Sequence, residues 1–128
     1  MRGLLDTHAF LWFARGDAKL SPAAMAFILD RSTIKLVSPA TYWEIAIKIA
    51  LGKYTLDRPY EAFMQAALFD NGFSVLPIEP RHTERLTTLP HHHKDPFDRL
   101  LAATALVEGL TIISADPSFD VYGVTRLW

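Results

Sequence analysis

The chain contains no cysteine and no long run of apolar residues. Without thiols it can form no disulfide, no thiolate metal site and no cysteine nucleophile. The apolar stretch at residues 3–14 is interrupted by Asp6 and His8, and no small-residue cleavage site follows, so we do not expect a signal peptide. No segment approaches the roughly 18–20 apolar residues that a membrane span requires. We therefore expect a cytoplasmic protein without a membrane partner.

An excess of charge of either sign is also missing. The formal net charge is −1, from 13 basic and 14 acidic residues. Overall charge therefore gives no evidence of nucleic-acid binding, and any RNA site must be a local basic patch. Half of the 128 residues are apolar and 21% are charged, which is typical of a globular protein and not of a disordered one. We expect one domain, residues 1–128, with no internal repeat or linker.

Short apolar segments alternate with helical patterns along the chain. We predict strands at residues 2–5, 34–37, 73–76, 111–113 and 124–126. We predict helices at residues 7–14, 39–51, 59–68, 80–86 and 96–108, and a further helix that begins at residue 22. Ser-Pro or Asp-Pro pairs mark the starts of several of these helices. This alternation predicts an α/β fold with a mostly parallel sheet and helices on both faces. In such folds, ligands bind at the carboxyl ends of the strands.

Four acidic residues are expected at that edge of the sheet. Asp6 directly follows the first strand, and Asp116 closely follows the fourth. Glu44 lies in the second turn of a helix that follows a strand, and such a helix begins at the same edge. Asp98 lies in the first turn of a helix that precedes a strand, and a right-handed crossover places its start there too. Clustered carboxylates repel one another unless a cation neutralises them. Hard divalent cations prefer oxygen ligands, and Mg²⁺ is the usual choice where the substrate is a phosphate.

Each of these acids also has a structural interpretation. An acid in the first turn of a helix, such as Asp98, is favoured by the helix dipole. Glu44 can pair with Lys48 one turn later, although its immediate neighbours are apolar. Asp116 can start a turn. Asp6 is harder to explain in this way because it interrupts an apolar segment, and the joint placement of all four acids favours a shared site.

Several neighbouring residues are candidates for supporting roles. The hydroxyls of Thr7 and Ser114 can hold a carboxylate or a metal-bound water, or can simply cap a strand end. Arg99 follows Asp98 and can contact a phosphate or an acid, or can be an ordinary surface charge.

Histidines and tryptophans provide further candidates. His91, His92 and His93 are adjacent and point in different directions, so at most one or two could bind the same ion, and we favour an exposed loop near the site. Trp12 and Trp43 can stack on bases. We favour core or dimer surface for both of them, because aromatic residues on amphipathic helices more often have those roles.

The segments that carry these acids resemble the PIN domain family, and within it the VapC-type toxins. The resemblance extends over nearly the whole chain and rests on LLDTH at residues 4–8, the segment 38–48 with WEI, DPFDRLLAA at 95–103, and SAD at 114–116 with Phe119 and Tyr122. DPFDRLLAA is the most specific match. The resemblance implies the sheet order 3-2-1-4-5 and an endoribonuclease activity that depends on Mg²⁺ or Mn²⁺. It also implies that the protein forms a homodimer and is inhibited by a small antitoxin.

Two choices stay open within the resemblance. Asp95 and Asp98 are both candidates for the third acid, and we choose Asp98. Asp120 is a second candidate beside Asp116. The predicted catalytic and metal-binding residues are Asp6, Glu44, Asp98 and Asp116.

Other functions fit the sequence less well. A phosphohydrolase with an aspartate nucleophile would have a second aspartate two positions after the first, where this chain has His8. A dinucleotide-binding module would have a glycine-rich turn after the first strand, where residues 7–9 are Thr-His-Ala. The more serious alternative is a catalytically weak PIN-like domain that binds RNA or a partner without cutting, and the presence of all four acids argues against it.

Overall fold

A five-stranded parallel sheet forms the centre of the protein, which a computed structural model describes over residues 1–128. The strands are β1 (Arg2–Leu5), β2 (Ile34–Val37), β3 (Ser74–Val75), β4 (Thr111–Ile113) and β5 (Arg126–Leu127). They lie in the order β3-β2-β1-β4-β5, and every neighbouring pair is parallel. The predicted fold class and sheet order are therefore confirmed.

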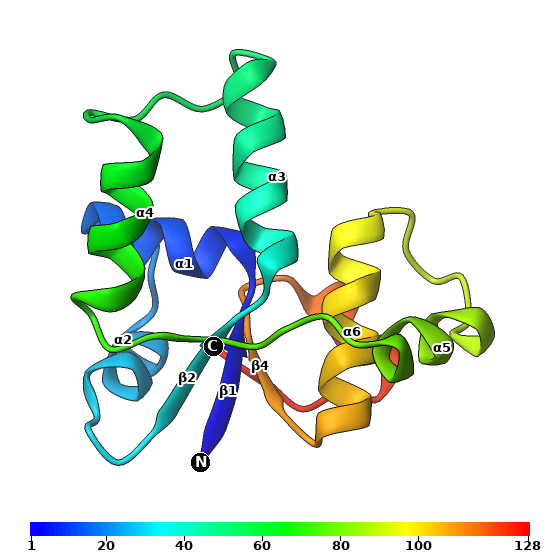
Figure 1. Ribbon diagram of the computed structural model, residues 1–128. Helices are drawn as coiled ribbons and strands as arrows, with labels where there is room; N and C mark the ends of the chain where they lie inside the picture. The colour runs from blue at the N-terminus through cyan, green and yellow to red at the C-terminus, as the bar shows by residue number, and fades with distance from the viewer.

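Six α-helices and one 3₁₀ helix connect the strands (Figure 1). They are α1 (Thr7–Arg15), α2 (Pro22–Leu29), α3 (Pro39–Ala50), α4 (Tyr60–Phe69), α5 (Pro80–Thr88), α6 (Pro96–Glu108) and the 3₁₀ helix η1 (Pro117–Tyr122). As predicted, the side chains of Ser21, Ser38 and Asp95 cap helix starts by accepting backbone N–H groups. None of the helices is both long and apolar enough to cross a lipid bilayer.

The two edge strands and the segment after Asp116 differ from the prediction. β3 is shorter than residues 73–76, and β5 begins two residues later than expected. Each of these strands pairs on one side only, so fewer ladder hydrogen bonds extend it. No helix is predicted after Asp116, but η1 forms there because the Asp116 side chain accepts the backbone N–H of Ser118 and starts a helical turn.

Side chains that alternate along the strands build a separate core on each face of the sheet. Leu5, Val37 and Ile113 belong to a cluster with apolar residues of α1–α4, whereas Leu4, Leu36 and Ile112 belong to a cluster with residues of α6 and η1. Figure 1 shows α1, α2 and α4 on one side of the strands and α5 and α6 on the other. The predicted coverage of both faces is therefore confirmed.

Candidate functional site

The carboxyl edge of the sheet is also where several helices begin. Asp6 caps α1 by accepting the backbone N–H of Ala9 at 2.8 Å. Asp95 caps α6, and Asp116 caps η1. The hydrogen bonds that start these helices therefore fix the positions of three acids. The positive ends of the helix dipoles favour negative charge at the same place.

Two buried carboxylates at this edge are held by hydroxyl groups. Asp6 and Glu44 are only 5% and 4% exposed. Ser114 Oγ donates to Asp6 Oδ2 at 2.5 Å, and Thr7 Oγ1 donates to Glu44 Oε1 at 2.5 Å. Thr7 and Ser114 thus contact carboxylates, which is the first of the two roles considered for them. The Glu44–Lys48 pair is formed too, with Lys48 Nζ 3.3 Å from Glu44 Oε2.

The imidazole of His93 lies between the two remaining acids. His93 Nε2 is 3.6 Å from Asp98 Oδ2 and 3.8 Å from Asp116 Oδ2. The backbone N–H of Asp95 donates to His93 Nδ1 at 3.0 Å, so in the neutral ring the proton is on Nε2. In its neutral form His93 therefore directs an N–H group toward the two carboxylates, at distances longer than a hydrogen bond, and not a free metal-ligating nitrogen.

His93 is the main site residue that the sequence did not identify. The expectation of an exposed loop holds for His91 and His92, and His92 packs against the Tyr122 ring with centroids 5.5 Å apart. His93 is half-buried beside the acids. The signal that could have found it is its place two residues before the capping Asp95, which lets the ring accept the backbone N–H of that residue.

The pKa of Asp98 shows that the four predicted acids are electrostatically coupled. Burial and, after it, nearby negative charges together raise the pKa of Asp98 to about 8; the charges are those of Asp95, Asp6, Glu44 and Asp116. A carboxyl group with so high a pKa lies in a place that lacks compensating positive charge. A divalent cation with oxygen ligands would supply that charge, so the residues present fit the predicted metal.

The pKa values of Asp6 and Asp116 are shifted in opposite directions. Burial raises the pKa of Asp6 and outweighs the hydrogen bonds from Ser114 and Ala9. Burial also acts on Asp116, but hydrogen bonds from Ser118 and the nearby His93 hold its pKa below the ordinary value. Asp116 is thus ionised more readily than Asp6 in the absence of a cation.

The geometry also separates the competing acids. Asp95 uses one carboxylate oxygen to cap α6, with the N–H groups of Phe97 and Asp98 at 2.8 and 3.2 Å. Asp120 is exposed and forms a two-pronged pair with Arg126, at 2.9 and 3.1 Å. Asp120 is also absent from the main charges acting on Asp98. These contacts favour Asp98 over Asp95 and Asp116 over Asp120.

Arg99 has neither of the contacts considered for it. Its side chain is buried, and its guanidinium donates to the carbonyl oxygens of Pro90 and Leu89 at 2.8 and 3.2 Å. Both sequence interpretations, a phosphate or acid contact and a surface charge, are therefore wrong. The hydrogen bonds of Arg99 instead connect α6 to the start of the loop that carries His93.

The two tryptophans differ in their surroundings. Trp12 is half-buried, packs on the first core cluster, and lies 5.7 Å from Trp128 between ring centroids. Trp43 is 65% exposed, so of the two roles expected for it the core is wrong, and the dimer surface stays a prediction.

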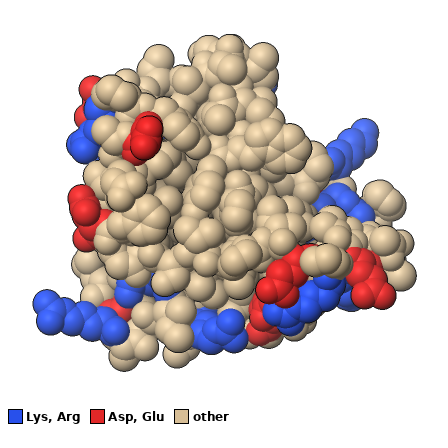
Figure 2. Space-filling view, in the orientation of Figure 1, with Lys and Arg blue, Asp and Glu red and all other residues tan.

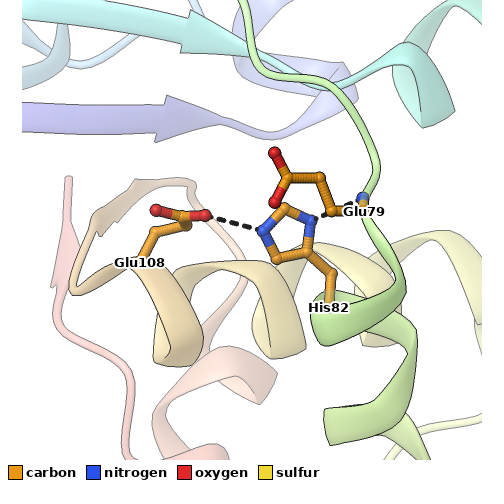
Figure 3. A group of neighbouring side chains, drawn as sticks. All are labelled: Glu79, His82 and Glu108. Atoms are coloured by element: carbon orange, nitrogen blue, oxygen red, sulfur yellow. Dashed lines mark hydrogen bonds and ion pairs between the residues drawn. The ribbon is translucent and has the colours of Figure 1, made fainter.

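A second cluster of ionisable groups lies away from the sheet edge and joins α5 to α6 (Figure 3). His82 is completely buried, accepts the backbone N–H of Glu79 at 3.0 Å through Nδ1, and contacts Glu108 Oε1 at 2.8 Å through Nε2. Arg81 also pairs with Glu108. Both ring nitrogens are thus occupied, and the cluster stabilises the helix contact; it does not present a free set of metal ligands.

The geometry defines an α/β protein with a parallel sheet and a cluster of acids at the carboxyl edge of that sheet. The family model described as "PIN domain" matches residues 3–124, and the chain belongs to that family. No curated protein sequence matches it.

Solved structures with the same fold include three complexes. The chain is 13% identical to a protein chain in the structure of VapBC2 from Rickettsia felis bound to a promoter DNA fragment. The TM-score is 0.73, and the match covers 98% of this chain and 97% of that chain. It is 18% identical to one from DNA-bound VapBC of Salmonella typhimurium, with TM-score 0.71 and coverage of 98% and 96%. It is 20% identical to one from VapBC-1 of nontypeable Haemophilus influenzae, with TM-score 0.67 and coverage of 98% and 96%. At these identities the likeness shows the shared fold.

The raised pKa of Asp98 predicts a local dependence of stability on pH. An aspartate whose pKa rises from 3.8 to about 8 on folding destabilises the folded state once the unfolded chain has lost that proton. This cost is absent well below pH 4, grows up to about pH 8 and is then constant. We expect Asp98→Asn to stabilise the metal-free protein above pH 8 by on the order of a few kcal/mol and to have little effect near pH 4.

Denaturant unfolding of both proteins between pH 4 and pH 9 measures this difference. Added Mg²⁺ should also stabilise the original protein more than the variant. Asp120→Asn is the control, because it removes an acid whose pKa is lowered by Arg126 and should give no such gain. A difference between Asp98→Asn and the original protein that does not change with pH would contradict the coupled acid cluster.

Proposed function

We propose that the chain is a metal-dependent endoribonuclease that acts in the cytoplasm as the toxin of a toxin–antitoxin pair and hydrolyses RNA phosphodiester bonds. PIN domains are generally nucleases. The observation that supports the proposal best is the group of four carboxylates that includes Asp98, a residue whose pKa is raised to about 8. Such a site favours binding of a divalent cation, and a water activated by that cation can hydrolyse a phosphodiester without a side-chain nucleophile.

The proposed ligands are Asp6, Glu44, Asp98 and Asp116, which would hold Mg²⁺ or Mn²⁺. When bound, the ion lowers the pKa of a coordinated water and stabilises negative charge on the phosphate. Ser114 and Thr7 fix the orientation of two carboxylates through the hydrogen bonds to Asp6 and Glu44. Each carboxylate oxygen keeps a further lone pair for an ion.

The proposal predicts that loss of any single ligand stops cleavage. Asp6→Asn, Glu44→Gln and Asp98→Asn should each lower the rate of RNA cleavage in Mg²⁺ by about 100-fold or more, because each removes negative charge from the ion site. Asp120→Asn should cut as fast as the original protein, since Asp120 pairs with Arg126 outside the cluster. Cleavage of a labelled RNA, followed by gel electrophoresis, measures these rates.

Two results would count against this mechanism. One is cleavage at full rate after treatment with EDTA. The other is an intact protein that binds RNA but does not cut it in Mg²⁺ or Mn²⁺, which would support the alternative of a PIN-like binding module.

The proposed partners are RNA, a cognate antitoxin protein and a second copy of the chain in a homodimer. The similar solved structures are VapBC complexes, which supports the antitoxin. Four carboxylates attract a guanidinium, which binds them with two hydrogen bonds. We therefore propose that the antitoxin inhibits by placing an Arg or Lys side chain in the acid cluster.

An apolar surface is available for the rest of the antitoxin contact. A hollow of about 320 Å³ lies between α3 and α4 and is lined by Tyr42, Tyr60, Glu61, Met64, Gln65, Leu68 and Phe69. Figure 2 shows that few charged side chains interrupt the face in view over these helices. Hydrophobic contacts of this kind are needed because a charge pair alone seldom gives tight binding. Phe13 and Met25, on α1 and α2, pack on the core and are not part of this surface.

The two parts of the antitoxin contact should separate by mutation. Replacing the inserted Arg or Lys of the antitoxin with Gln should restore cleavage more than it weakens binding. Tyr60→Ala with Phe69→Ala should weaken binding by about tenfold or more, because both side chains line the apolar hollow. Calorimetric titration and the cleavage assay measure the two effects, and a complex with full nuclease activity would contradict this account of inhibition.

A further inference from the structure

Two aromatic side chains next to the acid cluster have no role in the core. Trp43 precedes Glu44 on α3, and Phe97 precedes Asp98 on α6. Their ring centroids are 5.3 Å apart, and their planes meet at 79°, which is an edge-to-face contact. The pair therefore bridges the two helices that carry two of the proposed metal ligands.

The exposure of Trp43 has no explanation in folding. Its side chain is 65% exposed, the highest value among the exposed large apolar side chains of the protein. Neither Trp43 nor Phe97 belongs to either core cluster or packs against one. The edge-to-face contact with Phe97 holds this exposed indole beside the helix positions of Glu44 and Asp98, so it offers a flat apolar surface next to the acid cluster.

Most of the Lys and Arg side chains around the site already pair with other groups. Lys48 pairs with Glu44, Arg126 pairs with Asp120, and the Arg99 guanidinium is buried against backbone carbonyls. Lys94 is the exposed cation of the neighbouring loop. Few phosphate contacts are therefore available close to the acids, and RNA binding must gain free energy in another way. Stacking of a base on an aromatic ring contributes about 1–3 kcal/mol per base.

We propose that Trp43, supported edge-on by Phe97, is a stacking platform for one unpaired base of the RNA next to the bond that is cut. This inference rests on the proposed function and deepens it. A base inside a double helix is stacked on both faces and cannot offer one to Trp43, so the substrate class is single-stranded RNA or a loop. Trp43 is a positioning residue, because it would hold the strand while the acids perform the chemistry.

The platform is tested with a single-stranded RNA that the original protein cuts, and with a series of the same RNA in which one base at a time is removed. Trp43→Ala should lower kcat/KM by about 10-fold to 100-fold, mainly through KM, and Trp43→Phe should retain most of the activity. Leu51→Ala is the matched control, because Leu51 ends the same helix and is 64% exposed. It should change kcat/KM less than about threefold.

The series of abasic RNAs provides the decisive result. In the original protein, removal of one particular base near the cut should weaken binding and cleavage, and in Trp43→Ala the same removal should have no further effect. Equal penalties in both proteins, or unchanged kcat/KM in Trp43→Ala, would overturn the platform. A loss of antitoxin binding without a loss of RNA cleavage would overturn it too and would assign Trp43 to the protein partner.

Direct RNA binding, measured by fluorescence anisotropy in EDTA, separates this inference from the proposed function. If the original protein cuts no RNA but binds it with the same dependence on one base and on Trp43, the nuclease proposal fails and the platform stands. If it cuts RNA without that dependence, the platform alone fails.

Discussion

The capping of helices by acidic side chains at one edge of the sheet is the interaction on which the rest of the structure depends. Asp6, Asp95 and Asp116 each accept a backbone N–H at the start of a helix. The parallel order of the strands brings these helix starts together. The same residues thus start helices and concentrate negative charge, so a structural role for an acid at this edge does not argue against the proposed functional one.

This concentration of charge has a cost that the surrounding contacts only partly offset. Hydroxyl donors hold Asp6 and Glu44, and helix dipoles favour the negative charge. Even so, Asp98 keeps a pKa near 8. The polar edge lies between two separate apolar clusters, which stabilise the sheet from both faces and offset the cost of the clustered acids.

Local patterns were sufficient to predict most of the fold and the meeting of the four acids. Ser-Pro and Asp-Pro pairs mark helix starts, and apolar strands require cover on both faces. Contacts between segments that lie far apart in the sequence could not be predicted from these local patterns. Arg99 looked like a surface charge because the carbonyls of Leu89 and Pro90 that bury it lie in another segment. The ring of His93 and the exposure of Trp43 likewise depend on the tertiary packing of α3 and α6.

The central claim is that Asp98 and its neighbours form a divalent cation site, and proton release on Mg²⁺ binding tests it most directly. With a pKa of about 8, Asp98 is mostly protonated at pH 7 and must lose its proton to bind the ion. Calorimetric titration with Mg²⁺ in buffers of different ionisation enthalpy should show close to one proton released per ion at pH 7 and almost none at pH 9.5. Binding without proton release at pH 7, or proton release that persists in Asp98→Asn, would contradict the account.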